Sequence, residues 1–478
     1  MKNQKPKSNA LCPYAKKCGG CAYLNLSYEE QVQKKKKMVA DLLKPFGKVD
    51  EMITMEKPQH YRHKVHAVFS RDKGQILAGT YEKKSHKVVD VESCYIDNEK
   101  ADAIIRTIKD MLPSFKIKAY DEDKDYGLLR HVMVRVGHFT GEIMVVLVLT
   151  SPILPYKNDF VKVLRKKHPE ITTVVLNVND KRTNMVLGNR NITLYGKGYI
   201  VDKILGKSFR ISPTAFYQVN PEQTEKLYAR AIEYAGLTGK EVVLDAYSGT
   251  GTIGIAMSDQ AKEVLSVELN REAVKDAISN AKYNQVKNVR FVAADAGDFM
   301  VQMAEEKKHL DVLVMDPPRS GASEAFINAT LQLAPERIVY VSCGPDTLAR
   351  DLKVLTKGGY RLKKCTIVEM FPWTEHVETV VLLSQQKPDD HIEIEINLDE
   401  IDATSAESKA TYKEIEEWVQ EHYGFHVTNL NIAQVKQKHG IIERENYNKP
   451  KSEDSRQPGC PEEKVKAIED ALRHFQMI

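Results

Sequence analysis

The sequence has no run of apolar residues long enough to cross a membrane. None of its stretches reaches the roughly 18 consecutive apolar residues that a transmembrane helix requires. The first residues, 1–7, are rich in lysine and are not followed by the apolar core of a signal peptide. These absences predict a soluble protein that is not secreted and that has no membrane partner.

Cysteine is scarce and unevenly placed. The chain has 478 residues and seven cysteines, an odd number that argues against a disulfide framework in a protein without a signal peptide. Three of them form the pattern Cys12-x5-Cys18-Gly-Gly-Cys21, which favours a metal or cluster centre. Cys94 could supply the fourth thiolate of a cubane iron-sulfur cluster. A zinc site would instead take one of the histidines that follow: His60, His63, His66 and His86.

The composition excludes global disorder and a single small binding module. Hydrophobic residues make up 42% and charged residues 28% of the chain, and the length predicts roughly two to four domains. The net charge of +4 hides an asymmetry, because residues 389–478 carry 20 acidic and 11 basic side chains, a balance of −9 against +13 for residues 1–388. A basic body suggests a polyanionic partner, although solubility alone would explain the charge equally well.

The first half of the chain is rich in predicted strands. Residues 22–44 have the apolar spacing of a helix that ends at Pro45 and Gly47. From residue 61 to about 201, short β-branched runs alternate with turn residues. Strands are predicted over 64–69, 88–91, 131–136, 142–149 and 173–178, and helices over 101–112 and 156–167.

From about Pro213 the chain alternates between strands and helices, which predicts a doubly wound α/β sheet. Strands are expected over 241–244, 263–267, 289–292, 310–315, 337–341 and 377–383, the last of them antiparallel. Beyond residue 389 an acidic linker leads to helices over 411–421, 432–439 and 461–475. We therefore predict three domains: a strand-rich α+β domain over 1–212, a Rossmann-like domain over 213–388, and a small helical appendage over 389–478.

A glycine-rich turn at residues 249–254 predicts a cofactor site. An apolar strand ends at Asp245 and leads into Gly249, Gly251 and Gly254, where small residues let a ligand approach the backbone. Glu268 closes the next strand, where a carboxylate can accept hydrogen bonds from ribose hydroxyls. The turn has no Gly-Lys-Ser/Thr for a triphosphate, and Asp245 suits a cationic ligand. S-adenosylmethionine fits best.

Two later strands end in residues that suit catalysis on a nucleobase. The fourth ends in Asp316-Pro-Pro-Arg319, at a place where methyltransferases grip the base edge, and the fifth ends in Cys343, which favours a nucleophile. Addition of a thiolate to carbon 6 of a pyrimidine makes carbon 5 reactive toward a methyl sulfonium. A general base must then remove the carbon 5 proton. Near the last strand the candidates for this base are Glu375, His376 and Glu378.

Taken together, these motifs make the chain similar to the RNA uracil-5-methyltransferases, and within them to the iron-sulfur branch that forms 5-methyluridine in 23S ribosomal RNA. The resemblance spans residues 12–383. It rests on the cysteine pattern with Cys94, Phe216-Tyr-Gln-Val-Asn220, Asp245-Ala-Tyr-Ser-Gly-Thr-Gly251, Asp316-Pro-Pro-Arg319, Ser342-Cys-Gly-Pro345 with Ala349-Arg-Asp351, and Met370-Phe-Pro372 with His376-Val-Glu378.

The resemblance implies a role for individual residues. Cys343 is the expected nucleophile and Glu378 the expected base. The positions that match cofactor and active-site binding are Gln218, Tyr247, Thr252, Glu268, Asp295 and Asp316. A [4Fe-4S] cluster is expected on Cys12, Cys18, Cys21 and Cys94. The resemblance also implies RNA as partner and a cytoplasmic setting.

Several alternatives stay open. The same chemistry could act on transfer RNA, or the chain could be a non-catalytic RNA-binding iron-sulfur protein. A cytosine-5 DNA enzyme is disfavoured, because it would place its cysteine after the fourth strand. RNA affinity is expected from the basic central domain, through Arg62, Lys64, Arg130 and Arg135. Tyr247, Phe371 and Trp373 could stack on bases or belong to the core.

Overall fold

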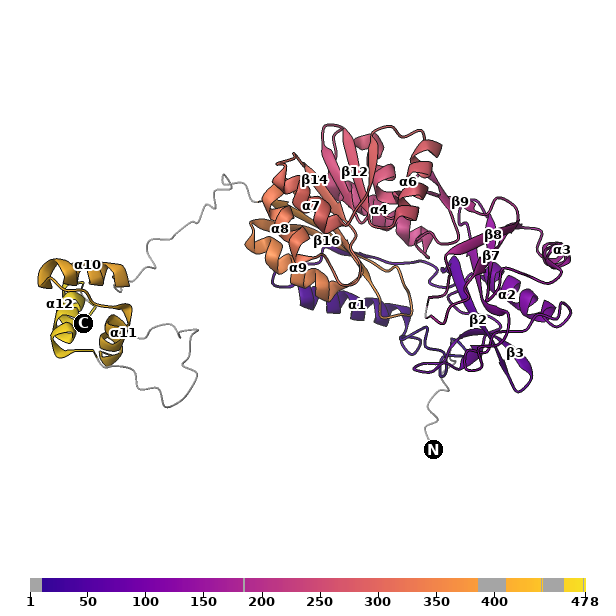
Figure 1. Cartoon of the computed structure of the whole chain (residues 1–478), viewed down its shortest axis with the longest axis horizontal. Coiled ribbons are helices and arrows are strands. Elements are labelled where there is room, and N and C mark those ends of the chain that lie inside the picture. The colour runs from indigo at the N-terminus through magenta and orange to yellow at the C-terminus, as the bar shows by residue number, and fades with distance from the viewer. Residues whose placement is uncertain (1–10, 184, 386–409, 440, 442–459, 476) are drawn as a thin grey trace, which may run out of the picture. The chain divides into compact units, whose positions relative to one another are not determined.

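The chain folds into two compact units, residues 1–390 and 391–478. The structure is a computed structural model that describes residues 11–183, 185–385, 410–439, 441, 460–475 and 477–478 (Figure 1). The division lies close to residue 389, where the acidic segment was expected to begin. Residues 386–409, which include the expected linker, lie outside the described residues.

The first sheet of the larger unit has seven strands. Their order is β4 (Val88–Asp90), β3 (Gln75–Tyr81), β2 (Lys64–Asp72), β5 (Leu129–Val136), β6 (Ile143–Leu149), β7 (Ile171–Val178) and β8 (Arg190–Tyr195). Neighbours are antiparallel except β6 and β7, which are joined through α3 (Lys157–Lys167). The helices α2 (Glu99–Met111) and α3 pack on one face, where Val65, Ala67 and Phe69 of β2 are buried.

The second sheet has eight strands and helices on both faces. Its order is β1 (Glu51–Ile53), β16 (Tyr360–Val368), β17 (Glu378–Gln385), β15 (Arg337–Ser342), β14 (Val312–Met315), β11 (Val242–Ala246), β12 (Glu263–Glu268) and β13 (Val289–Ala293). β17 is antiparallel to both of its neighbours, as expected from its position at the end of the series. The sheet is therefore the doubly wound type that the strand–helix alternation predicts.

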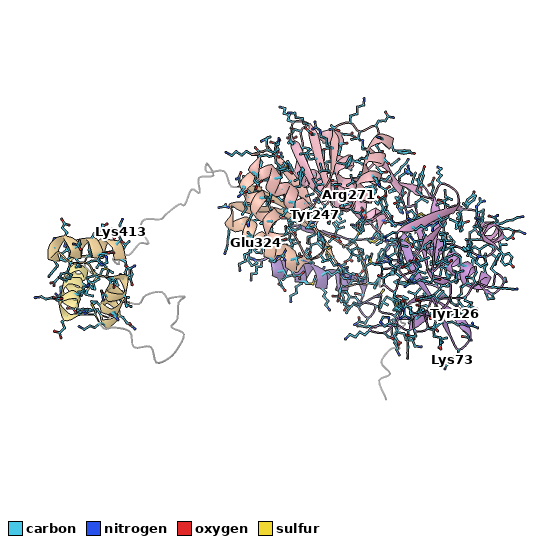
Figure 2. The ribbon with its side chains drawn as sticks, in the orientation of Figure 1. Lys73, Tyr126, Tyr247, Arg271, Glu324 and Lys413 are labelled. Atoms are coloured by element: carbon cyan, nitrogen blue, oxygen red, sulfur yellow. The ribbon has the colours of Figure 1, made fainter. Side chains whose placement is uncertain are left out.

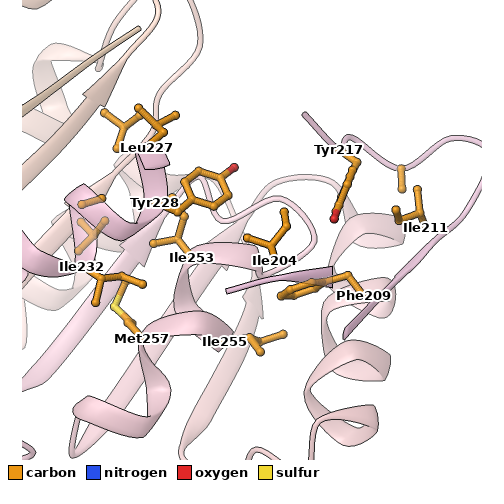
Figure 3. Close-up of a cluster of buried hydrophobic side chains, with 14 of the residues drawn as sticks. Ile204, Phe209, Ile211, Tyr217, Leu227, Tyr228, Ile232, Ile253, Ile255 and Met257 are labelled. Atoms are coloured by element: carbon orange, nitrogen blue, oxygen red, sulfur yellow. The ribbon is translucent and has the colours of Figure 1, made fainter. Parts of the chain in front are cut away.

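Two apolar layers cover this sheet. One layer contains residues from α4 (Pro221–Ala235), α5 (Thr252–Met257) and α6 (Arg271–Tyr283). The other contains residues from α1 (Tyr28–Leu43), α7 (Ala296–Glu305), α8 (Glu324–Leu333) and α9 (Pro345–Lys357). A ribbon of β9 (Ile200–Ile204) and β10 (Lys207–Ile211) joins the first layer, and Figure 3 shows Phe209 of this ribbon beside Ile255 of α5.

The N-terminal segment crosses the expected boundary at residue 212. α1 and β1 precede the first sheet in sequence, yet β1 pairs in parallel with β16 and Val39 and Leu43 of α1 pack into the second sheet's core. α1 begins at Tyr28 rather than near residue 22, because Ser27 and Glu30 form a capping box. The second sheet is thus built from both ends of the larger unit.

The smaller unit has its own core. Its described residues form three helices, α10 (Tyr412–Tyr423), α11 (Asn429–Lys438) and α12 (Glu462–His474), close to the three helices predicted there. Its core includes Ile415, Val419, Ile432, Ile468 and Leu472. In the described part of the chain, no helix is both long and apolar enough to span a bilayer.

Candidate active site

A pocket of about 890 Å³ opens at the carboxyl ends of the second sheet's central strands. Loops that follow β11, β12, β14 and β15 form most of it, which is where doubly wound sheets bind ligands. The first sheet contributes Lys64, and Arg62 just before β2 also lines the pocket. All eight residues predicted for catalysis and cofactor binding line this pocket: Gln218, Tyr247, Thr252, Glu268, Asp295, Asp316, Cys343 and Glu378. Figure 2 labels Tyr247, which lies among the helices and strands of the second sheet.

Strand register brings the predicted nucleophile and base together. Ser342 of β15 lies opposite Thr379 of antiparallel β17, and the Thr379 Oγ1 donates to the Ser342 carbonyl at 3.2 Å. Cys343 directly follows Ser342 at the end of β15, and Glu378 directly precedes Thr379 at the start of β17. Two side chains 35 positions apart in sequence therefore share one edge of the sheet.

The loops after β14 and β15 are tied to each other. Thr347 Oγ1 donates to the carbonyl of Arg319 at 3.2 Å and to that of Gly344 at 2.9 Å. This contact holds Cys343 beside the Asp316-Pro-Pro-Arg319 turn. The arrangement places a thiol, two carboxyl groups and a guanidinium around one part of the pocket.

Burial shifts the titration of all three acidic groups upward. It raises the pKa of Asp316 to about 7 and that of Glu378 well above its usual value, the latter also through the nearby Asp316 carboxylate. Burial, followed by Glu378 and Asp316, raises the pKa of the Cys343 thiol to about 11. The carboxyl groups of Asp316 and Glu378 have no hydrogen-bond partner in the described part of the chain. Such unpaired, perturbed groups in a pocket mark a reactive site.

The glycine turn after β11 leaves room for a ligand against the backbone. Gly249 and Gly251 have φ of +55° and +77°, and a Cβ on Gly251 would approach the ring of Phe291 to 2.9 Å. Glu268 accepts from the N–H groups of Gly249 at 3.0 Å and Asn270 at 2.7 Å. These bonds fix the Glu268 carboxylate at the pocket wall.

Two predicted carboxylates also serve the backbone. Asp295 lines the pocket and is also the N-cap of α7, where its carboxylate accepts a hydrogen bond from the Gly297 N–H at 2.8 Å. Asp245 does not face the pocket: it is 1% exposed and accepts from the Gly254 N–H at 2.9 Å. One carboxyl oxygen of Asp245, Oδ2, thus holds the turn, whereas Oδ1 is buried without a hydrogen-bond partner, so the expectation that its charge favours a cationic ligand stays a prediction.

Sequence reasoning missed Tyr228 of α4. Its side chain is buried and lines the pocket, where it lies near the side chains of Gln218 and Thr252. In the sequence Tyr228 has the spacing of an ordinary core residue of an amphipathic helix, so no local signal distinguishes it. Its position depends on the tertiary fold, and Figure 3 shows Tyr228 of α4 in the same cluster as Ile253 of α5.

The loop of residues 369–377, between β16 and β17, leads into Glu378. Residues of the N-terminal segment bind this loop. The backbone N–H groups of Ala22 and Tyr23 donate to the carbonyl of Trp373 at 3.0 and 2.9 Å. Lys35 pairs with Glu369 at 2.6 Å, and both side chains are fully buried. Trp373 is itself buried, so it belongs to the core, whereas Phe371 lines the pocket.

Four cysteines line a second, smaller cavity of about 70 Å³ between the N-terminal loop and the first sheet. They are Cys12, Cys18, Cys21 and Cys94. The Gly20 N–H donates to the Cys18 sulfur at 3.3 Å, a bond that favours a thiolate. Burial, followed by the charges of Cys18 and Cys12, raises the pKa of Cys21 to about 12. Within the described ranges, no three Cys, His, Asp or Glu side chains are grouped closely enough to hold a metal ion.

Of the four basic residues expected to contact RNA, two are structural. Arg130 is 4% exposed and donates to the carbonyls of Asn179 and Lys181 at 3.0 and 2.6 Å. Arg135 is 3% exposed and donates to the carbonyl of Ala215. Arg62 and Lys64 instead line the active-site pocket.

The doubly wound sheet, its glycine turn and the antiparallel β17 define the class of S-adenosylmethionine-dependent methyltransferases. A solved structure of this class is similar to the chain: a tRNA (uracil-54, C5)-methyltransferase of Pyrococcus abyssi bound to S-adenosyl-L-homocysteine. The TM-score is 0.66 at 29% identity, and the match covers 76% of this chain and 86% of the other.

Sequence comparison gives the particular family. Residues 27–386 match the model of the tRNA (uracil-5-)-methyltransferase family. Proteins described as uncharacterized RNA methyltransferases are 44% identical in Halalkalibacterium halodurans and 43% in Clostridium tetani. These matches cover 78% and 79% of this chain, and 83% and 84% of the relatives. The chain belongs to this family and is an S-adenosylmethionine-dependent RNA (uracil-5-)-methyltransferase.

Proposed function

We propose that this enzyme methylates carbon 5 of a specific uridine in 23S ribosomal RNA through a covalent adduct with Cys343. The observation that carries the proposal is the adjacency of Cys343 and Glu378 at one sheet edge, in a pocket that also holds Asp316 and the glycine turn. S-adenosylmethionine, when bound at that turn, supplies the methyl group as an electrophile. The proposed setting is the cytoplasm.

The proposed reaction begins and ends with a free thiolate. The Cys343 sulfur forms a bond to carbon 6 of uracil, which makes carbon 5 nucleophilic. Carbon 5 takes the methyl group, and Glu378 then accepts the carbon 5 proton. The electron pair of that C–H bond forms the 5,6 double bond as the S–C6 bond breaks. The net products are 5-methyluridine, S-adenosylhomocysteine and one proton.

The environment of Glu378 suits a proton acceptor. Its burial raises its pKa well above the usual value of a carboxyl group, so its ionised form is a stronger base than an exposed glutamate. Arg319 opposes this shift and lies near both Glu378 and Cys343. We propose that Arg319 stabilises the charged forms of both groups during the cycle.

We propose a [4Fe-4S] cluster on Cys12, Cys18, Cys21 and Cys94, which line one cavity but whose side chains would have to move closer together to hold it. Four thiols from two segments line one space, and thiolates are the ligands that iron-sulfur clusters take. Of the histidines considered for zinc, His86 is largely exposed and the ring of His60 bonds to the carbonyl of Asp97. Methyl transfer is redox neutral, so the proposed role of the cluster is to hold the N-terminal loop.

Transfer RNA is the competing substrate. The similar Pyrococcus abyssi enzyme acts on tRNA by its name, and the family model carries the same word. Ribosomal RNA is favoured by the cysteine pattern, through the resemblance to the iron-sulfur branch. A non-catalytic RNA-binding role is the third candidate, and the assembled set of reactive side chains argues against it.

The test is nucleoside mass spectrometry on unmodified 23S ribosomal RNA and transfer RNA, each incubated with anaerobically purified protein and S-adenosylmethionine. New 5-methyluridine in ribosomal RNA alone supports the proposal. The same product in transfer RNA alone overturns the substrate and keeps the mechanism. If neither RNA gains the product while the protein is folded and binds RNA, the non-catalytic role is the correct one.

A further inference from the structure

One wall of the catalytic pocket carries a lysine without an anionic partner. Lys64 is the first residue of β2, its side chain is half-buried, and it lines the same pocket as Cys343 and Glu378. The charged groups that act on it are Arg135 and Arg62, both cations. In the described part of the chain no carboxylate forms an ion pair with Lys64.

The surroundings of Lys64 are unfavourable for a cation. β2 and β5 place Lys64 directly opposite Arg135, and like charges in opposed positions destabilise a sheet. Burial, followed by Arg135 and Arg62, lowers the pKa of Lys64 to about 7. Arg135 is held by the carbonyl of Ala215, and Arg62 lies 3.5 Å from Asp97. This repulsion is relieved when an anion binds beside Lys64.

The first sheet and the segment before it contribute only cations to the pocket, whereas the second sheet's side contributes all of its carboxylates together with Arg319. The carboxylates Glu268, Glu272 and Asp276 come from β12 and α6, beside the glycine turn. Lys64 and Arg62 come from the first sheet and the segment that precedes it. A cationic sulfonium cofactor is attracted to the acidic part. The basic part suits the other reactant, a polyanion.

We propose that the Lys64 ammonium binds a phosphate oxygen of the RNA backbone next to the uridine that is methylated, and so positions the uracil against Cys343. The proposal rests on the proposed RNA methylation. Phosphate contacts from lysine fix the register of a nucleic acid without reading its sequence. Lys64 is thus a positioning residue at the mouth of the reaction site, whereas the buried Arg130 and Arg135 are not.

The first experiment compares Lys64→Gln, Lys64→Arg and the wild type with a matched control, Lys203→Gln, which alters an exposed lysine of β9. RNA binding is measured against salt concentration, and KM for RNA is measured separately from KM for S-adenosylmethionine. Lys64→Gln is expected to raise KM for RNA about tenfold or more and to lower the slope of log affinity against log salt by about one. Lys64→Arg is expected to restore most of the affinity, and Lys203→Gln to match wild type.

The second experiment locates the phosphate. Once the methylated uridine is mapped, short RNAs carry one uncharged methylphosphonate, either on its 5′ side or on its 3′ side. One of the two is expected to weaken the wild type as much as Lys64→Gln does, and to have no further effect on Lys64→Gln.

Two results would overturn the assignment: wild-type RNA affinity and salt slope for Lys64→Gln, or full sensitivity of that variant to both neutral linkages. The RNA-binding measurements are repeated in a Cys343→Ala background, because binding can be measured without catalytic turnover. Failure of methylation by the wild type therefore refutes the proposed function independently of Lys64.

Discussion

The buried Lys35–Glu369 pair fastens α1 to the 369–377 loop, and we expect its disruption to unfold the larger unit readily. Lys35 Nζ lies 2.6 Å from Glu369 Oε1 and donates to the carbonyl of Phe371 at 3.0 Å, and both charged side chains are 0% exposed. Lys35→Met leaves the Glu369 carboxylate buried without a cation. Loss of one partner of a buried pair costs about 3–5 kcal/mol. The free energy of unfolding should fall by that amount.

The assay uses the fluorescence of Trp373, which lies in the affected loop. The chain has two tryptophans, so a Trp418→Phe background leaves Trp373 as the reporter during urea denaturation. Lys37→Met, an exposed lysine of the same helix, is the control and should change stability by less than about 0.5 kcal/mol. The double variant Lys35→Met/Glu369→Leu should recover most of the loss, because both charges are gone. The reasoning is refuted if Lys35→Met costs under about 1 kcal/mol or if the double variant is no better.

Four further predictions concern the catalytic pocket and the cysteine cavity. Cys343→Ala should abolish 5-methyluridine formation, seen by nucleoside mass spectrometry, while RNA affinity stays within about twofold of wild type. Glu378→Gln should slow product release about 10²–10⁴-fold and let a covalent RNA–protein adduct accumulate on denaturing gels; absence of the adduct would contradict its role as base. Alkylation of Cys343 by iodoacetamide, followed by peptide mass spectrometry, should accelerate roughly tenfold per pH unit from pH 7 to 9, because its raised pKa of about 11 keeps the thiolate fraction small there. If the proposed cluster is present, Cys94→Ala should remove its visible absorbance and lower thermal stability, and an unchanged spectrum would refute four-cysteine ligation.

Local patterns in the sequence predicted most of the helices and many of the strands. Alternating burial in β2 and the capping residues of α10 and α11 are short-range features, and these elements lie near their predicted positions. β1 and β16 were not predicted. β1 has only three residues, and it exists because β16 offers a parallel edge more than 300 positions away. No local pattern can report such pairing.

The proposed catalytic residues were accessible to sequence reasoning because each stands at the end of a strand or in a motif. Cys343 follows an apolar strand, and Asp316 precedes two prolines, so position along the chain indicates the sheet edge at which they meet. The surroundings of Asp245 could not be inferred from its position in the sequence. Whether a carboxylate at a strand end faces the ligand or the turn depends on side-chain direction, and here the Gly254 N–H captures it.

The sequence by itself determined the family, the strand–helix alternation of the second sheet's central part, and the chemical types of the candidate reacting groups, because these follow from residue identity and spacing. Only the tertiary structure decided which charges are buried and what they face. Arg135 and Lys64 are similar cations in the sequence, yet one is enclosed against a carbonyl and the other lines the pocket. The physical reason is that desolvation and pairing depend on neighbours brought together by the fold, across separations that no local pattern encodes.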